Sequence, residues 1–314
     1  MTRSTDQDRL LLRVAQLYHE QDLTQQEVGE RLHLTRWQVG RLLQRAKKMG
    51  IVRVEIVHPD ARRHQIEATL CARAGLKDAI VVPGSSDPAQ SMRLVARAAA
   101  DYLADLEPRP TSVAISWGRT MAALANAISP GWAKNVTVIQ ANGGLSLPGE
   151  GSPANVIGQL AHHGQGRPVF LPAPALVGSP DLAEALRNEE QVRSVLAMAR
   201  SADVLVFSCG GLCPDSVLIG SGCISLSDVT QAEEAGCVGD VVARYINADG
   251  YPVSEELEAR TIGLTLTDVI NAKLSIAVAA GQAKFQIAEA VVRRGLCDIL
   301  VTDEATASYL TRQF

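Results

Sequence analysis

The feature that most constrains this fold is a regular alternation of short apolar runs with amphipathic helical segments, which extends from residue 79 to residue 302. The runs are apolar throughout, as strands buried on both faces are. The segments between them repeat apolar residues at helical spacing. We therefore predict an α/β domain, in which helices cover both faces of a mainly parallel, doubly wound, Rossmann-like sheet. The predicted strands are residues 79–82, 112–115, 136–140, 169–171, 204–208, 275–279 and 298–302.

Composition supports a large core without a membrane segment. Hydrophobic residues make up 46% of the 314 residues and aromatic residues only 4%, so Ala, Val, Leu and Ile are expected to fill the core. A chain of this length fits two domains. It has no apolar run of about 18 residues, so no membrane span is expected, and its charged start does not resemble a secretory leader. With six cysteines expected as reduced thiols, we predict a cytoplasmic protein with no metal and no cofactor.

Three glycine-containing loops directly follow predicted strands, where parallel sheets bind their ligands. In the first loop, Gly118 allows close backbone approach, and Thr120 with the first amides of the next helix can hold an oxyanion. In the second, Asn142 can both donate and accept hydrogen bonds. The third brings Lys284 to the start of a helix. Each loop could be an ordinary turn, but the three together favour a ligand site. They comprise residues 116–120, 140–144 and 280–284.

The first sixty residues contain two capping-box sequences close together, Thr24-Gln-Gln-Glu27 and Thr35-Arg-Trp-Gln38. In a capping box, two side chains satisfy the unpaired amides at the start of a helix. An apolar helical stripe precedes them, over residues 9–20. Two short helices joined by a turn near His33 are typical of a helix-turn-helix. Residues 52–57 then alternate like a strand.

The second of the two short helices is basic. Residues 35–54 hold six basic residues and no acidic one, although the whole chain has a formal net charge of −4. A local excess of positive charge suits contact with a polyanion at one end of the chain. The start of such a helix enters the major groove of DNA, where Arg can bind guanine and Gln can bind adenine. We predict base contacts from Arg36, Trp37, Gln38 and Arg41. We predict phosphate contacts from Thr35, Arg45, Lys47, Lys48 and Arg53. The alternative is a module for protein contacts, whose charges are only solvated.

A polar run separates this head from the rest of the chain. Pro59 and the residues 60–65 predict a boundary, which gives a DNA-binding domain at 1–58 and an effector-binding and oligomerisation domain at 59–314. The stripe of Ile66, Leu70 and Ala74 follows and ends at Gly75. We expect this stripe to support a contact between subunits.

Several sequences, taken together, resemble the SorC family of sugar-operon regulators. In the head, the resemblance covers residues 23–46 and Gly50-Ile-Val52, with Gly29, Trp37 and Gly40 as departures. In the larger domain, it rests on Ser116-Trp-Gly-Arg-Thr120, Asn142-Gly-Gly144, Leu171-Pro-Ala-Pro174, Gly236-Cys-Val-Gly-Asp240 and Thr302-Asp-Glu-Ala-Thr-Ala307.

The resemblance implies an effector domain similar to sugar-phosphate isomerases and deaminases, which senses a phosphosugar within a homodimer or a dimer of dimers. It implies a phosphate site formed by Gly118, Arg119, Thr120 and Lys284, and sugar contacts from Asn142 and Asp240, with Gly143 and Gly144 as further effector-binding residues. Ala280 departs from the family, which usually has Gly there.

Plainer interpretations exist for single residues. Asp240 could be a turn residue, and the pair 303–304 is expected to cap the last helix. The histidine pair 162–163 is expected at the surface, because neighbouring residues do not share a helix face and have no further ligand at metal-site spacing. Lys284 could be solvated and pair with Glu289.

Three functions fit these observations. The first is a DNA-binding repressor of a sugar or polyol catabolic operon, with double-stranded DNA and a phosphorylated sugar or polyol as its partners. The second is a phosphosugar isomerase or deaminase that carries a DNA-binding head. Such an enzyme needs a general base near the sugar carbons, and the sequence has no evident Asp–His–Glu set. The third is an interaction scaffold without ligand binding. We predict the first, which is not an enzyme.

Overall fold

The computed structural model describes residues 2–52, 62–145, 151–211 and 224–314. The chain divides into two compact units, residues 1–57 and residues 58–314. The sequence-based boundary between residues 58 and 59 lies outside the described residues, as do residues 53–57 of the predicted strand at 52–57.

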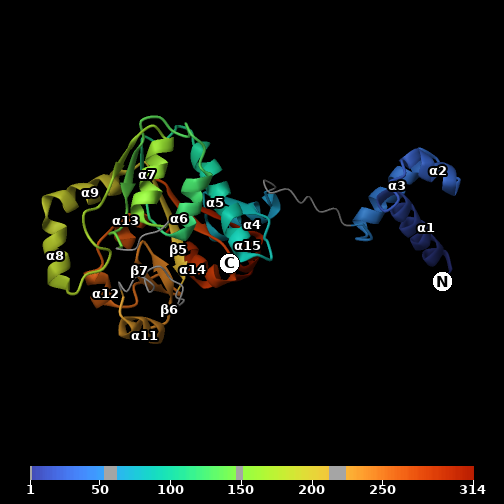
Figure 1. Ribbon diagram of the computed structural model, residues 1–314. Coiled ribbons are helices and arrows are strands. Elements are labelled where there is room, and N and C mark those ends of the chain that lie inside the picture. The colour runs from blue at the N-terminus through green and yellow to red at the C-terminus, as the bar shows by residue number, and fades with distance from the viewer. Residues whose placement is uncertain (1, 53–61, 146–150, 212–223) are drawn as a thin grey trace. The chain divides into compact units, whose positions relative to one another are not determined.

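The smaller unit is a bundle of three helices, α1 (Thr2–His19), α2 (Gln25–Leu32) and α3 (Arg36–Lys48) (Figure 1). Both predicted capping boxes form, at the starts of α2 and α3. The turn between these helices lies close to α2: a Cβ atom at Gly29 would lie 2.5 Å from the carbonyl oxygen of Leu34. The apolar stripes meet in a small core of Val14, Leu17, Val28, Val39 and Leu43. The predicted helix-turn-helix arrangement is therefore present.

The larger unit is built on a parallel sheet with the strand order β1-β9-β8-β5-β2-β3-β4. The strands are β1 (Asp78–Val82), β2 (Ser112–Ile115), β3 (Thr137–Gln140), β4 (Arg167–Val169), β5 (Val204–Gly211), β8 (Ser275–Ala279) and β9 (Ile299–Asp303). The sequence placed β4 two residues too late, at 169–171. This strand leaves the ladder early, because the amide of Leu171 donates to the side chain of Gln140 (3.2 Å).

A hairpin that the sequence did not predict extends β5. Strands β6 (Cys237–Val241) and β7 (Arg244–Asn247) are antiparallel, and β6 pairs with the last residues of β5. Their two-residue turn is Val242-Ala243, with φ of 48° and 69°. Such turns usually contain Asn and Gly, so these residues carry no recognisable turn signal.

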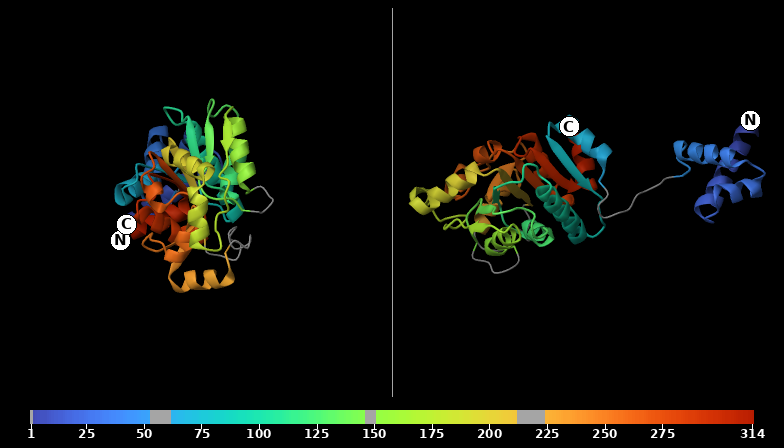
Figure 2. Two further views of the ribbon diagram at one scale, coloured as in Figure 1. Left: turned by 90° about the vertical axis from the view of Figure 1, so that its left-hand side faces the viewer. Right: turned by 90° about the horizontal axis from the view of Figure 1, so that it is seen from above.

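Helices cover both faces of the sheet, as predicted (Figures 1 and 2). One face packs against α5 (Pro88–Ala104), α6 (Arg119–Ala127) and α7 (Pro153–His163). The other packs against α4 (His64–Ala74), α9 (Glu190–Ser201), α14 (Phe285–Arg293) and α15 (Glu304–Gln313). Neighbouring strand residues serve opposite faces, so Val81 and Val82 belong to different halves of the core. The remaining helical segments are α8 (Pro180–Asn188), α11 (Leu226–Glu234), α12 (Glu255–Arg260), α13 (Leu266–Ile270) and the 3₁₀ turn η1 (Gln282–Lys284).

The stripe on α4 packs within the domain's own core. Leu70 is fully buried, and Ile66 and Ala74 pack against the same cluster. The expectation that this stripe supports a contact between subunits is therefore wrong. No helix in the described part of the chain is long and apolar enough to cross a membrane.

Candidate ligand cavity and nucleic-acid interface

A cavity of about 390 Å³ lies at the carboxyl end of the sheet. Its walls include loops that follow β2, β3 and β8, together with the end of β5 and the β6–β7 hairpin. From β2 the chain continues outward through β3 and β4, whereas from β5 it continues the opposite way through β8 and β9. The neighbouring strands β2 and β5 thus form the topological switch point, where open α/β sheets bind ligands.

Six of the eight predicted effector residues line this cavity: Gly118, Arg119, Thr120, Asn142, Asp240 and Lys284. The other two, Gly143 and Gly144, do not line it. They connect the loop to neighbouring backbone, since their amides donate to the carbonyls of Ile262 (2.9 Å) and Ala173 (2.8 Å). A Cβ atom at Gly143 would lie 2.2 Å from the carbonyl oxygen of Pro174. Close packing therefore explains Gly143.

One wall of the cavity is the start of α6. Gly118 precedes the helix with φ of 123°, and its carbonyl accepts from the amide of Ala122 (2.8 Å). The first amides of a helix lack partners within the helix, and the helix dipole adds positive potential at this end. Because Gly118, Arg119 and Thr120 all line the cavity, this wall is suited to an anion.

Lys284 adds a positive charge at the end of η1. It lies over the end of β5, where a Cβ atom at Gly211 would be 3.2 Å from its Nζ. Within the described ranges, no carboxylate lies within 4.0 Å of this ammonium. Glu289, the alternative partner, binds Arg293 (2.6 Å) and the hydroxyl of Tyr309 (2.7 Å) instead. The ammonium thus has no ion-pair partner among the residues described.

Asp240 supplies a half-buried carboxyl group to the same cavity. Its Oδ2 accepts from the amide of Ala243 (3.1 Å). Burial raises the pKa of Asp240 to about 6, although the nearby positive charge of Lys284 and the Ala243 hydrogen bond act in the opposite direction. A Cβ atom at Gly210 would lie 1.7 Å from Oδ1, so a side chain at residue 210 would displace this carboxyl group.

Asp240 also stabilises an unfavourable turn. Both Val242 and Ala243 have positive φ, which costs about 1–3 kcal/mol for a residue other than glycine. Both residues line the cavity together with Asp240. The carboxyl group therefore belongs to the turn and also lines the cavity.

Asn142 offers a hydrogen-bond acceptor that the protein does not use. Its backbone carbonyl accepts from the side-chain amide of Gln140 (2.8 Å), and the indole of Trp117 donates to the next carbonyl, that of Gly143 (2.8 Å). The side-chain Oδ1 of Asn142 is buried and has no partner among the described residues. Buried polar atoms nearly always have a partner, so this oxygen is available to a ligand hydroxyl.

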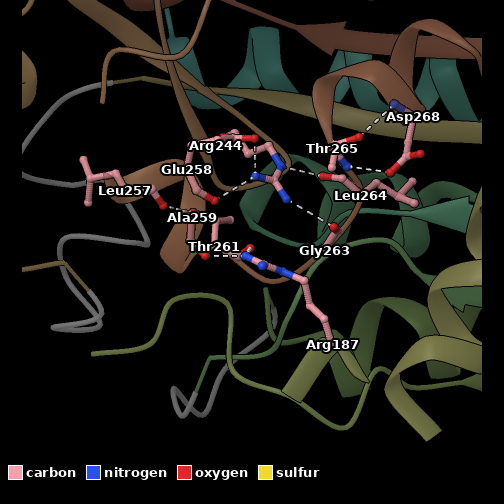
Figure 3. A network of polar contacts seen from close by, with 10 residues as sticks. All are labelled: Arg187, Arg244, Leu257, Glu258, Ala259, Thr261, Gly263, Leu264, Thr265 and Asp268. Carbon is pink, nitrogen blue, oxygen red and sulfur yellow. Dashed lines mark hydrogen bonds and ion pairs between the residues drawn. The ribbon is translucent and has the colours of Figure 1, made fainter. Parts of the chain in front are cut away.

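The sequence analysis did not single out Arg244, which lies at the centre of a polar network (Figure 3). Arg244 is only 2% exposed. It donates to the carbonyls of Leu264 (2.6 Å) and Gly263 (3.2 Å) and pairs with the carboxylate of Glu258 (2.5 Å). Gly263 in turn forms a β-bridge with Asn142. Arg244 thus connects the hairpin that carries Asp240 to the backbone behind Asn142.

The smaller unit has a surface hollow of about 1,210 Å³ beside α3. The predicted residues Arg36, Trp37, Arg41, Arg45, Lys47 and Lys48 line it, together with Tyr18, His19 and Gln25 among others. Thr35 and Gln38 do not line it. They form the capping box instead: the amide of Thr35 donates to Oε1 of Gln38 (2.7 Å), and the amide of Gln38 donates to Oγ1 of Thr35 (3.3 Å).

Two expectations concern residues outside these sites. Asp303 caps α15 through the amide of Thr306 (2.8 Å), and Glu304 pairs with Arg63 (2.9 Å). The cap at 303–304 is thus confirmed for Asp303. In the pair 162–163, Nδ1 of His163 lies 3.0 Å from the carbonyl oxygen of Ile128. Over the described ranges, no three His, Cys, Asp or Glu side chains gather as a metal site.

A comparison with models of protein families shows to which family this chain belongs. The Sugar-bind family model, described as "Putative sugar-binding domain", matches residues 59–312. The chain belongs to this family. The predicted resemblance to sugar-binding regulators of the SorC type is thereby confirmed.

Individual proteins similar to this chain are named as transcriptional regulators. The transcriptional regulator LsrR of Klebsiella pneumoniae is 32% identical over 305 residues, which cover 96% of this chain and 92% of that protein. The deoxyribonucleoside regulator of Bacillus subtilis is 27% identical and covers 97% of this chain and 98% of its own. A DeoR family transcriptional regulator from Listeria monocytogenes has a TM-score of 0.72 at 25% identity, covering 79% and 98% of the two chains. The full-length sorbitol operon regulator SorC from Klebsiella pneumoniae has the same fold, with a TM-score of 0.73 at 22% identity and coverage of 97% and 98%.

Proposed function

We propose that this protein is a sequence-specific, cytoplasmic transcriptional regulator of a sugar or polyol catabolic operon, and that a phosphorylated sugar or polyol controls its binding to DNA. One observation carries the proposal. A single cavity combines an anion-binding helix start, an ammonium without an ion-pair partner among the described residues and a buried acceptor without a hydrogen bond. The same chain has a basic helix-turn-helix unit, and its relatives are transcriptional regulators.

In this proposal, the two sides of the cavity recognise different parts of the effector. The start of α6 and Lys284 bind the phosphate, because a phosphate neutralises both positive features and gains charge-assisted hydrogen bonds. Oδ1 of Asn142 and the carboxyl group of Asp240 accept hydrogen bonds from sugar hydroxyls. Gly143 and Gly144 support the Asn142 loop without contacting the ligand.

The head reads DNA through α3. Arg36, Trp37 and Arg41 are the proposed base-contacting residues, since they lie in the first half of the helix and line the surface hollow. Arg45 and Lys47 contact phosphates, which position the protein without reading sequence. Thr35 and Gln38 hold the start of the helix in shape.

We propose regulation without catalysis, although the fold also suits phosphosugar isomerases. Isomerisation and deamination need a general base that is kept in position next to the reacting carbons. Among the described residues that line the cavity, Asp240 is the only carboxylate and no histidine is present. The carboxylate of Asp240 accepts a hydrogen bond from the backbone amide of Ala243 in the turn. No described side chain therefore orients Asp240 as a base.

We further propose that the functional protein is a homo-oligomer. A single helix-turn-helix reads a short half-site, and specific affinity requires at least two heads on neighbouring half-sites. We assign the contact between copies to the larger domain.

The experiment that tests this function uses the full chain. DNA fragments that bind the protein are first selected from a random double-stranded pool. The affinity for the selected DNA is then measured with a panel of phosphorylated pentoses, hexoses and polyols, each paired with its unphosphorylated counterpart. We expect a phosphorylated compound to change DNA affinity and to raise the melting temperature. At a hundredfold excess of ligand over Kd, binding stabilises the folded protein by about 2.7 kcal/mol. Turnover of a sugar phosphate would instead support the enzyme, and a lack of response to every compound would support the scaffold.

A further inference from the structure

An exposed tryptophan lies among the basic side chains of α3. Trp37 is 84% exposed, the highest exposure among the large apolar side chains that the structure describes. It is the second residue of the helix and lines the same hollow as Arg36 and Arg41. Large apolar surface in contact with water is unfavourable by about 25 cal/mol per Å². Exposed apolar groups among cations therefore indicate a binding surface whose partner is negative and partly apolar.

The neighbouring side chains favour an apolar contact at this position. Recognition of adenine by glutamine needs both the oxygen and the nitrogen of the amide. In Gln38, the oxygen already accepts from the amide of Thr35 (2.7 Å) and from its hydroxyl (3.0 Å). Bidentate contact by Gln38 would break the cap of α3, so base recognition near the helix start depends on other residues.

The surface next to Trp37 includes a glycine, Gly40. Residues 37, 40, 41 and 44 share one face of α3, because they are separated by three or four positions. Gly40 has no side chain there, and a Cβ atom at this residue would already lie 3.4 Å from Oε1 of Gln25. A groove-facing group that approaches the indole between Trp37 and Arg41 therefore meets no side chain from residue 40 itself, and the side chain of Gln25 borders this position.

We propose that Trp37 recognises the C5 methyl group of a thymine in the major groove and is a specificity-determining residue of the head. The thymine methyl is the apolar group that the bases present in this groove, and the phosphates on either side of it match the cations around the indole. This inference rests on the proposed DNA-binding function. It goes further by naming the thymine methyl as the chemical group that α3 recognises.

The test removes single methyl groups from the DNA. Once an operator has been selected with the full-length protein, each thymine is replaced in turn by deoxyuridine, which differs only by the missing methyl. The Kd of every substituted operator is measured for the wild type, for Trp37→Ala and for Leu12→Ala. Leu12 is the matched control, since it is an exposed apolar residue (49%) on α1 of the same unit.

We expect one thymine in each half-site at which deoxyuridine weakens wild-type binding about fourfold, which corresponds to one buried methyl group. In Trp37→Ala this ratio should fall to one at that position, while Leu12→Ala should retain it. A wild-type protein that selects an operator but shows no such position, or a Trp37→Ala variant that keeps the ratio, overturns the inference and leaves the proposed function intact. A wild-type protein that selects no DNA sequence overturns both.

Discussion

Nη2 of Arg244 donates to the carbonyl oxygen of Gly263 over 3.2 Å, and Gly263 lies directly against Asn142. A Cβ atom at Gly263 would be 2.8 Å from Cα of Asn142. A buried guanidinium on the hairpin that carries Asp240 therefore holds the backbone that supports Asn142. Arg244 thus fixes the positions of Asn142 and Asp240, the two residues proposed to bind the sugar, although Arg244 itself does not line the cavity.

Replacing this guanidinium should destabilise the protein strongly. In Arg244→Met, the carbonyls of Gly263 and Leu264 and the carboxylate of Glu258 lose their buried partner. We expect the free energy of unfolding to fall by about 3 kcal/mol, as measured by urea denaturation. Arg293→Met is the control, because Arg293 is 43% exposed where it pairs with Glu289, and it should cost less than about 1 kcal/mol. Equal losses in the two variants would contradict the role of Arg244.

Replacing Lys284 should weaken the response to a phosphorylated effector while preserving the fold. In Lys284→Met, the phosphate loses a charge-assisted hydrogen bond, which corresponds to about a tenfold to hundredfold higher effector concentration at half response. Binding to operator DNA without effector should be unchanged. The measurement is a dose-response curve of DNA binding, followed by fluorescence anisotropy.

Lys273→Met provides the matched control for that measurement. Lys273 is also a lysine beside a strand of the sheet, but it pairs with Asp203 on the surface (2.9 Å) and does not line the cavity. Its dose-response curve should coincide with that of the wild type. If Lys284→Met also gives the wild-type curve, the phosphate site has to be assigned to Arg119 and the start of α6.

The raised pKa of Asp240 should make the ligand-free protein lose stability as the pH rises. Burial raises this pKa to about 6, above the ordinary value of about 3.9. Protonation therefore favours the folded state below about pH 4, and this contribution is lost as the pH rises to about 6. Asp240→Asn imitates the protonated group at all pH values. Relative to the wild type, its free energy of unfolding should increase by up to about 3 kcal/mol between pH 4 and pH 7.

Relative to the wild type, the free energy of unfolding of Asp203→Asn should change with pH in the opposite direction. Although burial opposes the shift, hydrogen bonds from Thr111, Lys273 and Ser112 hold the pKa of Asp203 well below its usual range. The wild type should therefore gain stability over Asp203→Asn as the pH rises through the acidic range. Denaturation curves of the three proteins at matched pH values test both signs. A constant difference between wild type and Asp240→Asn would show that Asp240 titrates normally.

Arg41 and Lys47 should differ in how they affect DNA binding. Arg41 lies on the groove-facing half of α3 in the proposed function, so Arg41→Ala should cost about 1–3 kcal/mol on the selected operator and relax specificity at one base pair. Lys47→Ala should weaken binding to all sequences alike and reduce the slope of log K against log salt concentration by about one. Titrations on operator and random DNA at several salt concentrations separate these outcomes. If Arg41→Ala weakened both DNAs equally, Arg41 would be a phosphate contact.

The local features of this protein could be derived from the sequence because each depends on neighbouring residues. The capping boxes at Thr24 and Thr35 involve partners three residues away. The apolar runs identified the parallel strands, since strands that are buried on both faces consist almost entirely of apolar residues. The loops after β2, β3 and β8 could be assigned to one edge of the sheet, because parallel strands all end on the same side.

Other features depended on contacts between distant parts of the chain. The β6–β7 hairpin was missed because Val242 and Ala243 adopt positive φ only where Asp240 and the surrounding core hold them there. The apolar stripe that contains Leu70 was assigned to a subunit contact, since periodicity shows that a face is buried but not what buries it.

The sequence by itself determined the order of the parallel strands, the basic helix of the head and six of the residues that line the cavity, because helix starts and buried strands have local chemical signatures. The tertiary structure alone decided which of those residues share the cavity and in what state. The raised pKa of Asp240 follows from its burial, and Arg244 finds its partners in Glu258, Gly263 and Leu264, fourteen to twenty residues away. Burial and long-range hydrogen bonds are properties of the packed chain, which no local pattern contains.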